Sequence, residues 1–244
     1  MTDVTTSSAP VPGLFSRAIG VVVSPKAMFE KLVPSPRVLG ALVLVGLVIG
    51  LAQGLPRLTE RGRQAALDQA VQQTERFTGQ PVTPEAYAAM QKTAPYQAYA
   101  TMVFAPAGVA LVTLLIAGVY FVIFNVVMGG TASYKQVVSV LAHAGVISAA
   151  GVLIAAPIQY MQGTANPMGP FTLSALAPML DENSFLARML GFISVISIWQ
   201  TIVTGIGLGV LYRRKAGNII LGLLVLSLAF SAIGATVMGM FSRR

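Results

Sequence analysis

Five long apolar segments limit what this chain can fold into, because each is close to the length that crosses a lipid bilayer. A bilayer core requires about 20 mostly apolar residues in helical form. In lipid the backbone N–H and C=O groups must be bonded within the segment, and a helix achieves this. We therefore predict an all-α, polytopic membrane protein with five transmembrane helices. They cover residues 38–55, 103–128, 137–160, 185–212 and 219–241.

The composition agrees with this class and excludes several kinds of site. Only 10% of the 244 residues are charged, against about 25% in soluble domains. The chain has no cysteine, which excludes disulfides, thiolate metal sites and cysteine nucleophiles. Its single histidine, His143, cannot form a multi-histidine metal site. We therefore expect no metal and no cofactor.

The net charge of +8 would indicate nucleic acid in a soluble protein. Here the lysines and arginines lie beside the apolar segments, where they set the topology and contact anionic lipid. We therefore expect membrane lipids as partners and no nucleic acid. The compact cluster of Arg213, Arg214 and Lys215 is predicted to determine topology first and to contact lipid headgroups second.

The N-terminal part of the chain is predicted to lie outside the bilayer core. Residues 1–13 are polar, and we expect a disordered tail. Residues 14–36 are apolar but interrupted, and Ser24-Pro25 is typical of a helix start. We predict two short amphipathic helices here. They lie in the membrane interface, or they pack as a cover on the helix bundle.

The predicted five-span domain covers residues 37–244 and contains one sizeable polar insertion. Residues 57–97 are rich in helix formers, and we predict an extramembrane helical hairpin. Its second helix starts at Thr83-Pro84 and should stop before Pro95. The hairpin is too small for a core of its own, so it must pack on the bundle or on a partner.

The topology depends on how the basic residues cluster, because eight of them fall on each side of the membrane. The cluster at 213–215 is compact, whereas acidic residues dilute the basic residues of 57–97, and the loop 161–184 has no lysine or arginine. Short, dense clusters favour the cytoplasmic side. We predict a cytoplasmic N-terminus and an outside C-terminus, with Arg243 and Arg244 at the outer interface.

Three segments carry a resemblance to a known family. They are FSRAIGVVVSPKAMFEKLVPSPRVLGALVLVGL, GGTASYKQVVSVLAHAGVI and SFLARMLGFISVISIWQTIVTGIGLGVLYRRKAGN. With five spans, they resemble the bacterial branch of the Yip family of Ypt/Rab-interacting membrane proteins. The most specific part runs from Ile198-Trp199 through a small-residue-rich helix to the basic turn ending in Lys215-Ala216.

The resemblance implies a five-helix bundle in the bacterial inner membrane with its N-terminus in the cytoplasm. Eukaryotic relatives are associated with vesicle transport and Rab GTPases. The Asp-Leu-Tyr-Gly-Pro-like motif of those relatives is not visible ahead of the first span, and a bacterium lacks Golgi traffic. The resemblance therefore implies an architecture, without a Rab-related role.

Four polar side chains within the predicted spans are candidate functional residues. Ionisable groups at membrane depth generally mark function, and His143 is the one ionisable candidate here. Amides also join neighbouring helices by hydrogen bonds. Each of these residues therefore either belongs to a functional site or joins neighbouring helices by a hydrogen bond. The set comprises His143, Asn125, Gln159 and Gln200.

Glycines repeat every four residues on two of the predicted spans. Such faces allow another helix backbone to approach closely. They indicate either a homo-oligomer or close packing within one bundle. The residues are Gly46, Gly50 and Gly54 in the first span, and Gly205 and Gly209 in the fourth.

The sequence favours a non-enzymatic membrane scaffold that binds lipids or partner proteins. The glycine faces, the interfacial helices and the family resemblance lead to this hypothesis. The alternative is a channel, a transporter or a lipid-moving protein that uses the buried polar residues of spans two to four. An enzyme is not expected, because the chain shows no nucleophile–base pair, metal set or paired carboxylates.

Overall fold

The computed structural model describes residues 12–166, 169–177, 179–181 and 184–241, without the side chains of residues 76 and 77. Most of the predicted tail at 1–13, and Arg243 and Arg244, lie outside the described residues. The described chain is helical, with one isolated backbone bridge between Thr172 and Ser194. In chain order the elements are α1 (Leu14–Val23), α2 (Pro25–Leu32), α3 (Leu39–Gly54), the 3-10 turn η1 (Pro56–Leu58), α4 (Glu60–Thr78), α5 (Pro84–Phe121), the π-helical η2 (Val122–Val127), α6 (Tyr134–Gln162), α7 (Phe185–Gly191), α8 (Val195–Leu211) and α9 (Ala216–Phe241).

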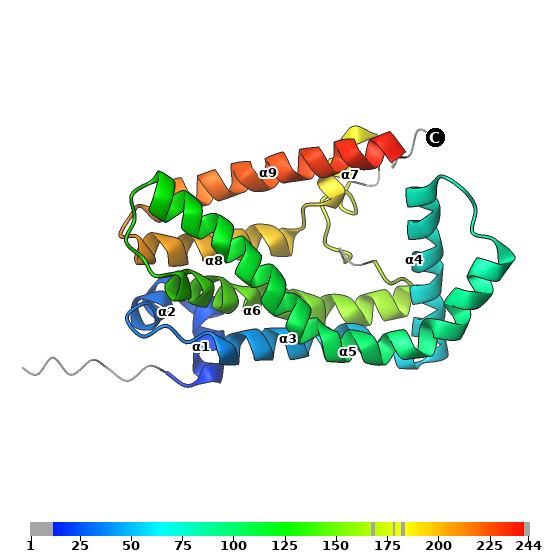
Figure 1. Cartoon of the computed structure of the whole chain (residues 1–244), viewed down its shortest axis with the longest axis horizontal. Helices are drawn as coiled ribbons and strands as arrows, with labels where there is room; N and C mark the ends of the chain where they lie inside the picture. The colour runs from blue at the N-terminus through cyan, green and yellow to red at the C-terminus, as the bar shows by residue number, and fades with distance from the viewer. Residues whose placement is uncertain (1–11, 167–168, 178, 182–183, 242–244) are drawn as a thin grey trace, which may run out of the picture.

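Five helices run along the long axis of the molecule, and the remaining helices lie at its two ends (Figure 1). These lengthwise helices are α3, α5, α6, α8 and α9. Helices α1 and α2 lie at one end, the N-terminal end, together with the turns that join α5 to α6 and α8 to α9. Helix α4 lies at the opposite end, the hairpin end, together with the last residues of α9.

Four helices in the described part of the chain are long and apolar enough to cross a membrane. These candidate spans are Leu39–Leu58, Pro84–Val127, Tyr134–Gln162 and Ala216–Met240. Helix α8 has 17 residues, which at about 1.5 Å per residue is shorter than a bilayer core of about 30 Å. The prediction of an all-helical, polytopic membrane protein is confirmed, whereas the fifth span stays a prediction.

The predicted continuous span 185–212 is wrong, because the structure divides it into α7 and α8. The backbone between them pairs with the preceding loop: Leu173 N donates to Ile193 O, and Val195 N donates to Phe171 O. Ser194 then caps α8 through a hydroxyl that accepts from Ser197 N. These bonds occupy backbone groups that a continuous helix would need.

The predicted stop before Pro95 is also wrong, because α5 continues from Pro84 to Phe121 with Pro95 and Pro106 inside it. Each proline removes only one backbone hydrogen bond of a 38-residue helix. Pro106 lies where α3 crosses α5, next to Gly46. Packing against α3 therefore supports the helix where its own backbone bonding is interrupted.

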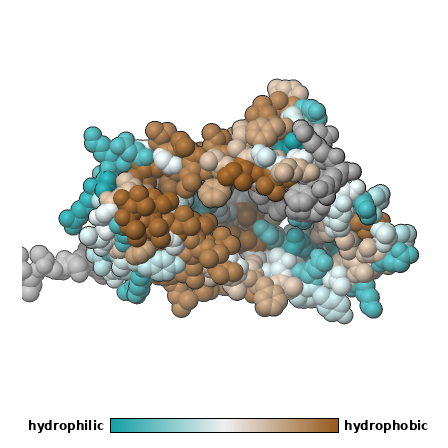
Figure 2. Space-filling model, turned by 45° about the horizontal axis from the view of Figure 1, so that its top comes forward, coloured by the Kyte–Doolittle hydropathy of each residue, from teal (hydrophilic) through white to brown (hydrophobic). Residues whose placement is uncertain are grey.

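The surface of the bundle is apolar along the middle and polar at the two ends (Figure 2). Large hydrophobic side chains are exposed along α5 and α9, among them Leu111, Leu115, Leu221, Val225 and Phe230. The main core lies between α2, α6 and α8 and includes Phe29, Val140 and Leu208. A surface of this kind requires an apolar solvent around the middle of the bundle, as expected for a membrane protein.

Candidate functional site

A polar cavity of about 250 Å³ lies at the hairpin end of the bundle. Its walls are the end of α3, the start of α4, the second half of α6 with the loop that follows, and the start of α8. No carboxylate is among the described residues that line it. The polar and charged lining residues are Gln53, Arg57, Arg61, Ser148, Gln159, Tyr160, Thr164, Asn166, Ser194 and Ser197.

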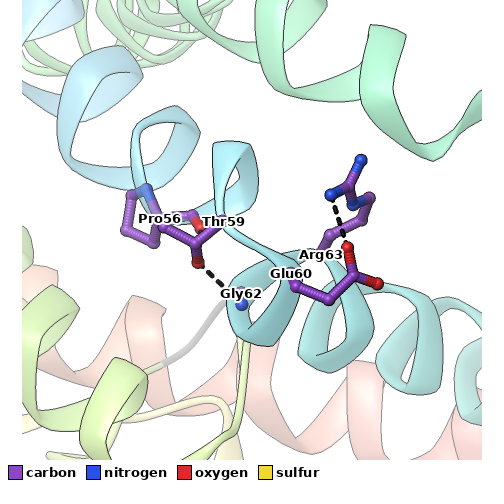
Figure 3. Close-up of polar contacts among 5 residues, drawn as sticks. All are labelled: Pro56, Thr59, Glu60, Gly62 and Arg63. Atoms are coloured by element: carbon purple, nitrogen blue, oxygen red, sulfur yellow. Dashed lines mark hydrogen bonds and ion pairs between the residues drawn. The ribbon is translucent and has the colours of Figure 1, made fainter.

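Arg57 and Arg61, which line this cavity, lie on either side of Thr59 in the turn from α3 into α4. Figure 3 shows the contacts that form this turn. Thr59 caps α4 by accepting a hydrogen bond from Gly62 N at 3.1 Å, and its own hydroxyl donates to Pro56 O at 2.8 Å. Gly62 lies directly against the Pro56 carbonyl, where a Cβ atom would collide with it. A threonine cap and a glycine thus allow α4 to leave α3 at a sharp angle.

Both arginines are held by neutral partners. Arg57 Nη1 donates to Thr101 Oγ1 at 2.7 Å. Arg61 Nη2 donates to Met161 O at 2.5 Å, and its guanidinium lies 5.7 Å from the ring centre of Tyr160, a cation–π geometry. A guanidinium has five N–H donors, so each side chain retains donors for a ligand. No described residue that lines the cavity is acidic, so none of them compensates the positive charge of the two arginines.

A second cavity, of about 470 Å³, lies deeper in the bundle between α3, α5, α6 and α8. No charged residue is among its described lining. Its α8 wall is polar, with Ser197, Gln200 and Thr204 one helical turn apart, and the walls from α3 and α5 are mostly apolar. Ser148 and Ser197 line both cavities, so the two spaces adjoin. Ser148 Oγ donates a hydrogen bond to Gln200 Oε1 at the boundary.

The predicted buried polar residues are placed in different regions. Gln159 lines the polar cavity, and Gln200 lines the deeper one. His143 is 1% exposed and lines neither; its Nδ1 lies 2.8 Å from Ser139 O, so this nitrogen carries the proton and donates. Asn125 lies in η2 and donates from Nδ2 to Ala132 O at 2.5 Å, which closes the turn into α6.

Sequence reasoning missed Arg57 and Arg61 as site residues. Both occur in the polar region after the first span, where basic residues are usually interpreted as topology signals. They lie in different elements, η1 and α4, with the extended residue Thr59 between them, so helical spacing does not place them together. The spacing alone does not indicate that α6 and α8 close a cavity beneath them.

Comparison with known proteins identifies the family. A family model of the Yip1 domain matches residues 19–238. The chain belongs to the Yip1 domain family. This Yip-family chain is 26% identical over 236 residues to the membrane protein YknW of Bacillus subtilis (strain 168), an alignment that covers 93% of each chain. The predicted bacterial Yip membership is confirmed, and no solved structure matches the chain.

The family match contains every residue that lines the two cavities. It also contains the glycine faces, which contact neighbouring helices of the same chain. Gly46, Gly50 and Gly54 face α5, while Gly205 and Gly209 face the start of α9 at Ile220 and Ala216. In this Yip-family chain the two faces are therefore occupied by intrachain packing.

The basic turn between α8 and α9 lies at the N-terminal end, far along the bundle from the polar cavity (Figure 1). Arg213 has a positive φ of 52°, and Arg214 Nη2 donates to Met128 O at 3.0 Å. Arg214 thereby joins this turn to the turn between α5 and α6. The three basic residues of the turn are exposed. Their contact with lipid headgroups stays a prediction.

Proposed function

We propose that this Yip-family protein is a non-enzymatic membrane protein that binds an anionic lipid. The headgroup occupies the polar cavity beside Arg57 and Arg61, and an acyl chain enters the deeper cavity. One observation carries the proposal: a cavity with two arginines and no described carboxylate adjoins a second cavity, between α3, α5, α6 and α8, whose described lining is uncharged. This arrangement is complementary to an amphiphile with a negative head.

The chemistry of the lining supports this choice of ligand. Arginine binds phosphate through paired, charge-assisted hydrogen bonds, and the amides and hydroxyls of the cavity can accept or donate to the remaining headgroup atoms. An acyl chain gains about 0.8 kcal/mol for each methylene group removed from water. Inside a bilayer that gain is absent, so headgroup recognition has to supply the selectivity.

The wider role that we propose is a scaffold in the bacterial inner membrane with a cytoplasmic N-terminus. The hairpin of α4 and the start of α5 extends beyond the ends of the neighbouring helices (Figure 1). Its side chains Tyr96 and Tyr99 are 74% and 60% exposed. Exposed aromatic residues of this kind supply contact area in protein interfaces, which supports partner binding at this end.

The lipid proposal is tested with the Arg61→Gln variant and the matched control Arg63→Gln. Arg63 lies on the same helix but bonds Glu60 at 2.6 Å and does not line the cavity. Binding of phosphatidylglycerol to the detergent-purified proteins is measured by native mass spectrometry. Loss of a charge-assisted contact, about 1.5–3 kcal/mol, should weaken binding about 10- to 100-fold in Arg61→Gln. Equal affinities of the two variants would reject the site.

Movement of lipid between leaflets is the second candidate function, because the two cavities adjoin at Ser148 and Ser197, and Ser148 bonds Gln200 there. Lipid scrambling in liposomes tests it with Gln200→Leu, which replaces the amide by an apolar side chain of similar length. A scrambling rate that falls while phosphatidylglycerol binding persists would support movement. If the unmodified protein does not scramble lipid, lipid movement is rejected and lipid binding remains the proposed function.

A further inference from the structure

A buried arginine with two guanidinium nitrogens unbonded among the described residues lies at the N-terminal end of the molecule, at the opposite end from the polar cavity. Arg17 belongs to α1 and is 7% exposed. Its Nε and Nη1 atoms are buried and have no acceptor among the described residues. Val21, one helical turn later, is fully buried in the main core. Arg17 therefore lies on the face of α1 that packs against the bundle.

Three elements meet around this guanidinium. Ser139 of α6 donates from Oγ to Arg37 O at 3.0 Å, which fixes the segment between α2 and α3. One turn along α6, His143 donates from Nδ1 to Ser139 O, and its Nε2 is buried without a donor. Arg17 is close enough to interact electrostatically with both Arg37 and His143. The buried guanidinium of Arg17 thus lies near the exposed guanidinium of Arg37 and the imidazole of His143.

The described carboxylates do not compensate this charge. Glu30, the described acid on the neighbouring α2, pairs with Lys26 at 4.0 Å, and both side chains are more than half exposed. The acids Glu60, Asp68, Glu75 and Glu85 belong to the hairpin at the other end. Burial, followed by the charge of Arg37, lowers the pKa of the Arg17 guanidinium. A buried cation without an anion is costly, so an anion from outside the described chain is expected to occupy this position.

We infer that Arg17 and Arg37 bind the phosphate of an anionic lipid headgroup at the N-terminal end of the bundle. The opposite face of α1 supports a lipid source. Phe15, Ile19 and Val23 are 73%, 63% and 76% exposed, and an apolar face of this kind inserts into the boundary between headgroups and acyl chains. The headgroups then lie at the depth of the arginine pair. This site is separate from the polar cavity and does not depend on the proposed function.

The test compares thermal unfolding of the full-length protein in phosphatidylcholine nanodiscs with and without phosphatidylglycerol. All variants are made in the Arg61→Gln background, so that the polar cavity does not contribute to the comparison. We expect phosphatidylglycerol to raise the Tm of this background protein. Arg17→Gln should lose most of that rise, and Lys26→Gln, which removes an exposed charge at the same end, should keep it.

A second variant keeps the test decisive if Arg17→Gln fails to fold. Arg37 is exposed, so Arg37→Gln should fold and should lose part of the rise in Tm. Inorganic phosphate added to phosphatidylcholine nanodiscs distinguishes the source: a rise equal to that given by phosphatidylglycerol would assign the site to free phosphate and overturn the lipid assignment. A full rise retained in both Arg17→Gln and Arg37→Gln would overturn the site itself.

Asp3 lies outside the described residues and is the remaining carboxylate close in sequence to α1. Asp3→Asn should keep the Tm of the background protein in both kinds of nanodisc, because in our proposal Asp3 is not the anion that neutralises Arg17. An equal loss of Tm in both lipids, together with no effect of phosphatidylglycerol, would assign the neutralising role to Asp3. That result would overturn the proposal.

Discussion

At the scale of single residues, the absence of a side chain at Gly46 determines how closely two membrane helices approach. An added Cβ atom at Gly46 would collide with the backbone of Pro106. At Gly50 it would lie 3.0 Å from Ala105 Cβ and 3.1 Å from Met102 O. Pro106 lacks the N–H that would otherwise bond Met102 O, so this free carbonyl faces the glycine stripe. Close backbone contact of this type is the usual means of packing helices in lipid.

Substitution of Gly46 by alanine tests this contact against a glycine that has space around it. Gly46→Ala should lower the free energy of unfolding by about 1–3 kcal/mol, because the added methyl group forces α3 away from α5. Gly118 of α5 has nothing within 4 Å of an added Cβ atom, and Gly118→Ala should raise stability by up to about 1 kcal/mol. Equilibrium unfolding in mixed micelles measures both variants. Similar effects at the two positions would contradict the packing assignment.

At the scale of elements, the direction of α4 decides whether the polar cavity exists. The helix starts immediately after η1, at the Thr59 cap, and Gly62 lies against the Pro56 carbonyl (Figure 3). This turn carries Arg57 and Arg61 over the end of α6, where Arg61 reaches Met161 O. The ligand-binding geometry that we propose is therefore built by backbone contacts at a turn as well as by the arginines.

Gly62→Ala tests the role of this turn. The new methyl group should displace α4 from Pro56, which should weaken phosphatidylglycerol binding although neither arginine is changed. We also expect a loss of about 1–3 kcal/mol of stability from the steric conflict. Gly222→Ala in α9 is the control, because a Cβ atom there meets nothing within 4 Å. Native mass spectrometry measures binding, and unchanged affinity in Gly62→Ala would show that the turn does not position the site.

At the scale of the whole molecule, the five lengthwise helices run in alternating directions between the two ends. The charged residues lie mainly at these ends. The N-terminal end carries Arg17, Arg37 and the basic turn at 213–215, whereas most described acids belong to the hairpin end. Basic residues concentrate on the cytoplasmic side of membrane proteins. The hairpin end also carries basic residues, among them Arg57, Arg61 and Arg63, so the cytoplasmic N-terminus stays a prediction. Helix α8 has only 17 residues, and its crossing most needs a test.

Cysteine labelling provides that test, since the natural chain has no cysteine. Single cysteines replace Gln80 in the hairpin, Gln162 at the end of α6, and Lys215 after α8, which are all exposed. A membrane-impermeant maleimide applied to spheroplasts should label the Gln80→Cys and Gln162→Cys variants. The Lys215→Cys variant should react only after permeabilisation. Labelling of all three from outside would show that α8 does not cross, and the reverse pattern would invert the topology.

Several features followed from local sequence, because their causes act within one segment. The length and apolarity of each stretch determined that the chain is a helical membrane protein, since lipid leaves the backbone few other ways to bond. The predicted helix start at Thr83-Pro84 is confirmed, because the Thr83 hydroxyl caps α5 by accepting from Ala86 N. Gln159 and Gln200 could be identified as polar candidates, because an amide inside an apolar stretch is unusual, although both are half-buried rather than buried.

The tertiary structure decided the features that depend on residues far apart in the chain. The loop at 171–173 pairs with 193–195 and interrupts the fourth apolar segment, and α3 supports α5 at Pro106. Arg57 and Arg61 became site residues only because α6 and α8 close a cavity beside them. Hydropathy and propensity are sums over neighbouring residues, so they determine which segments enter the membrane. Side-chain shape and hydrogen bonding between distant segments determine which polar groups meet there.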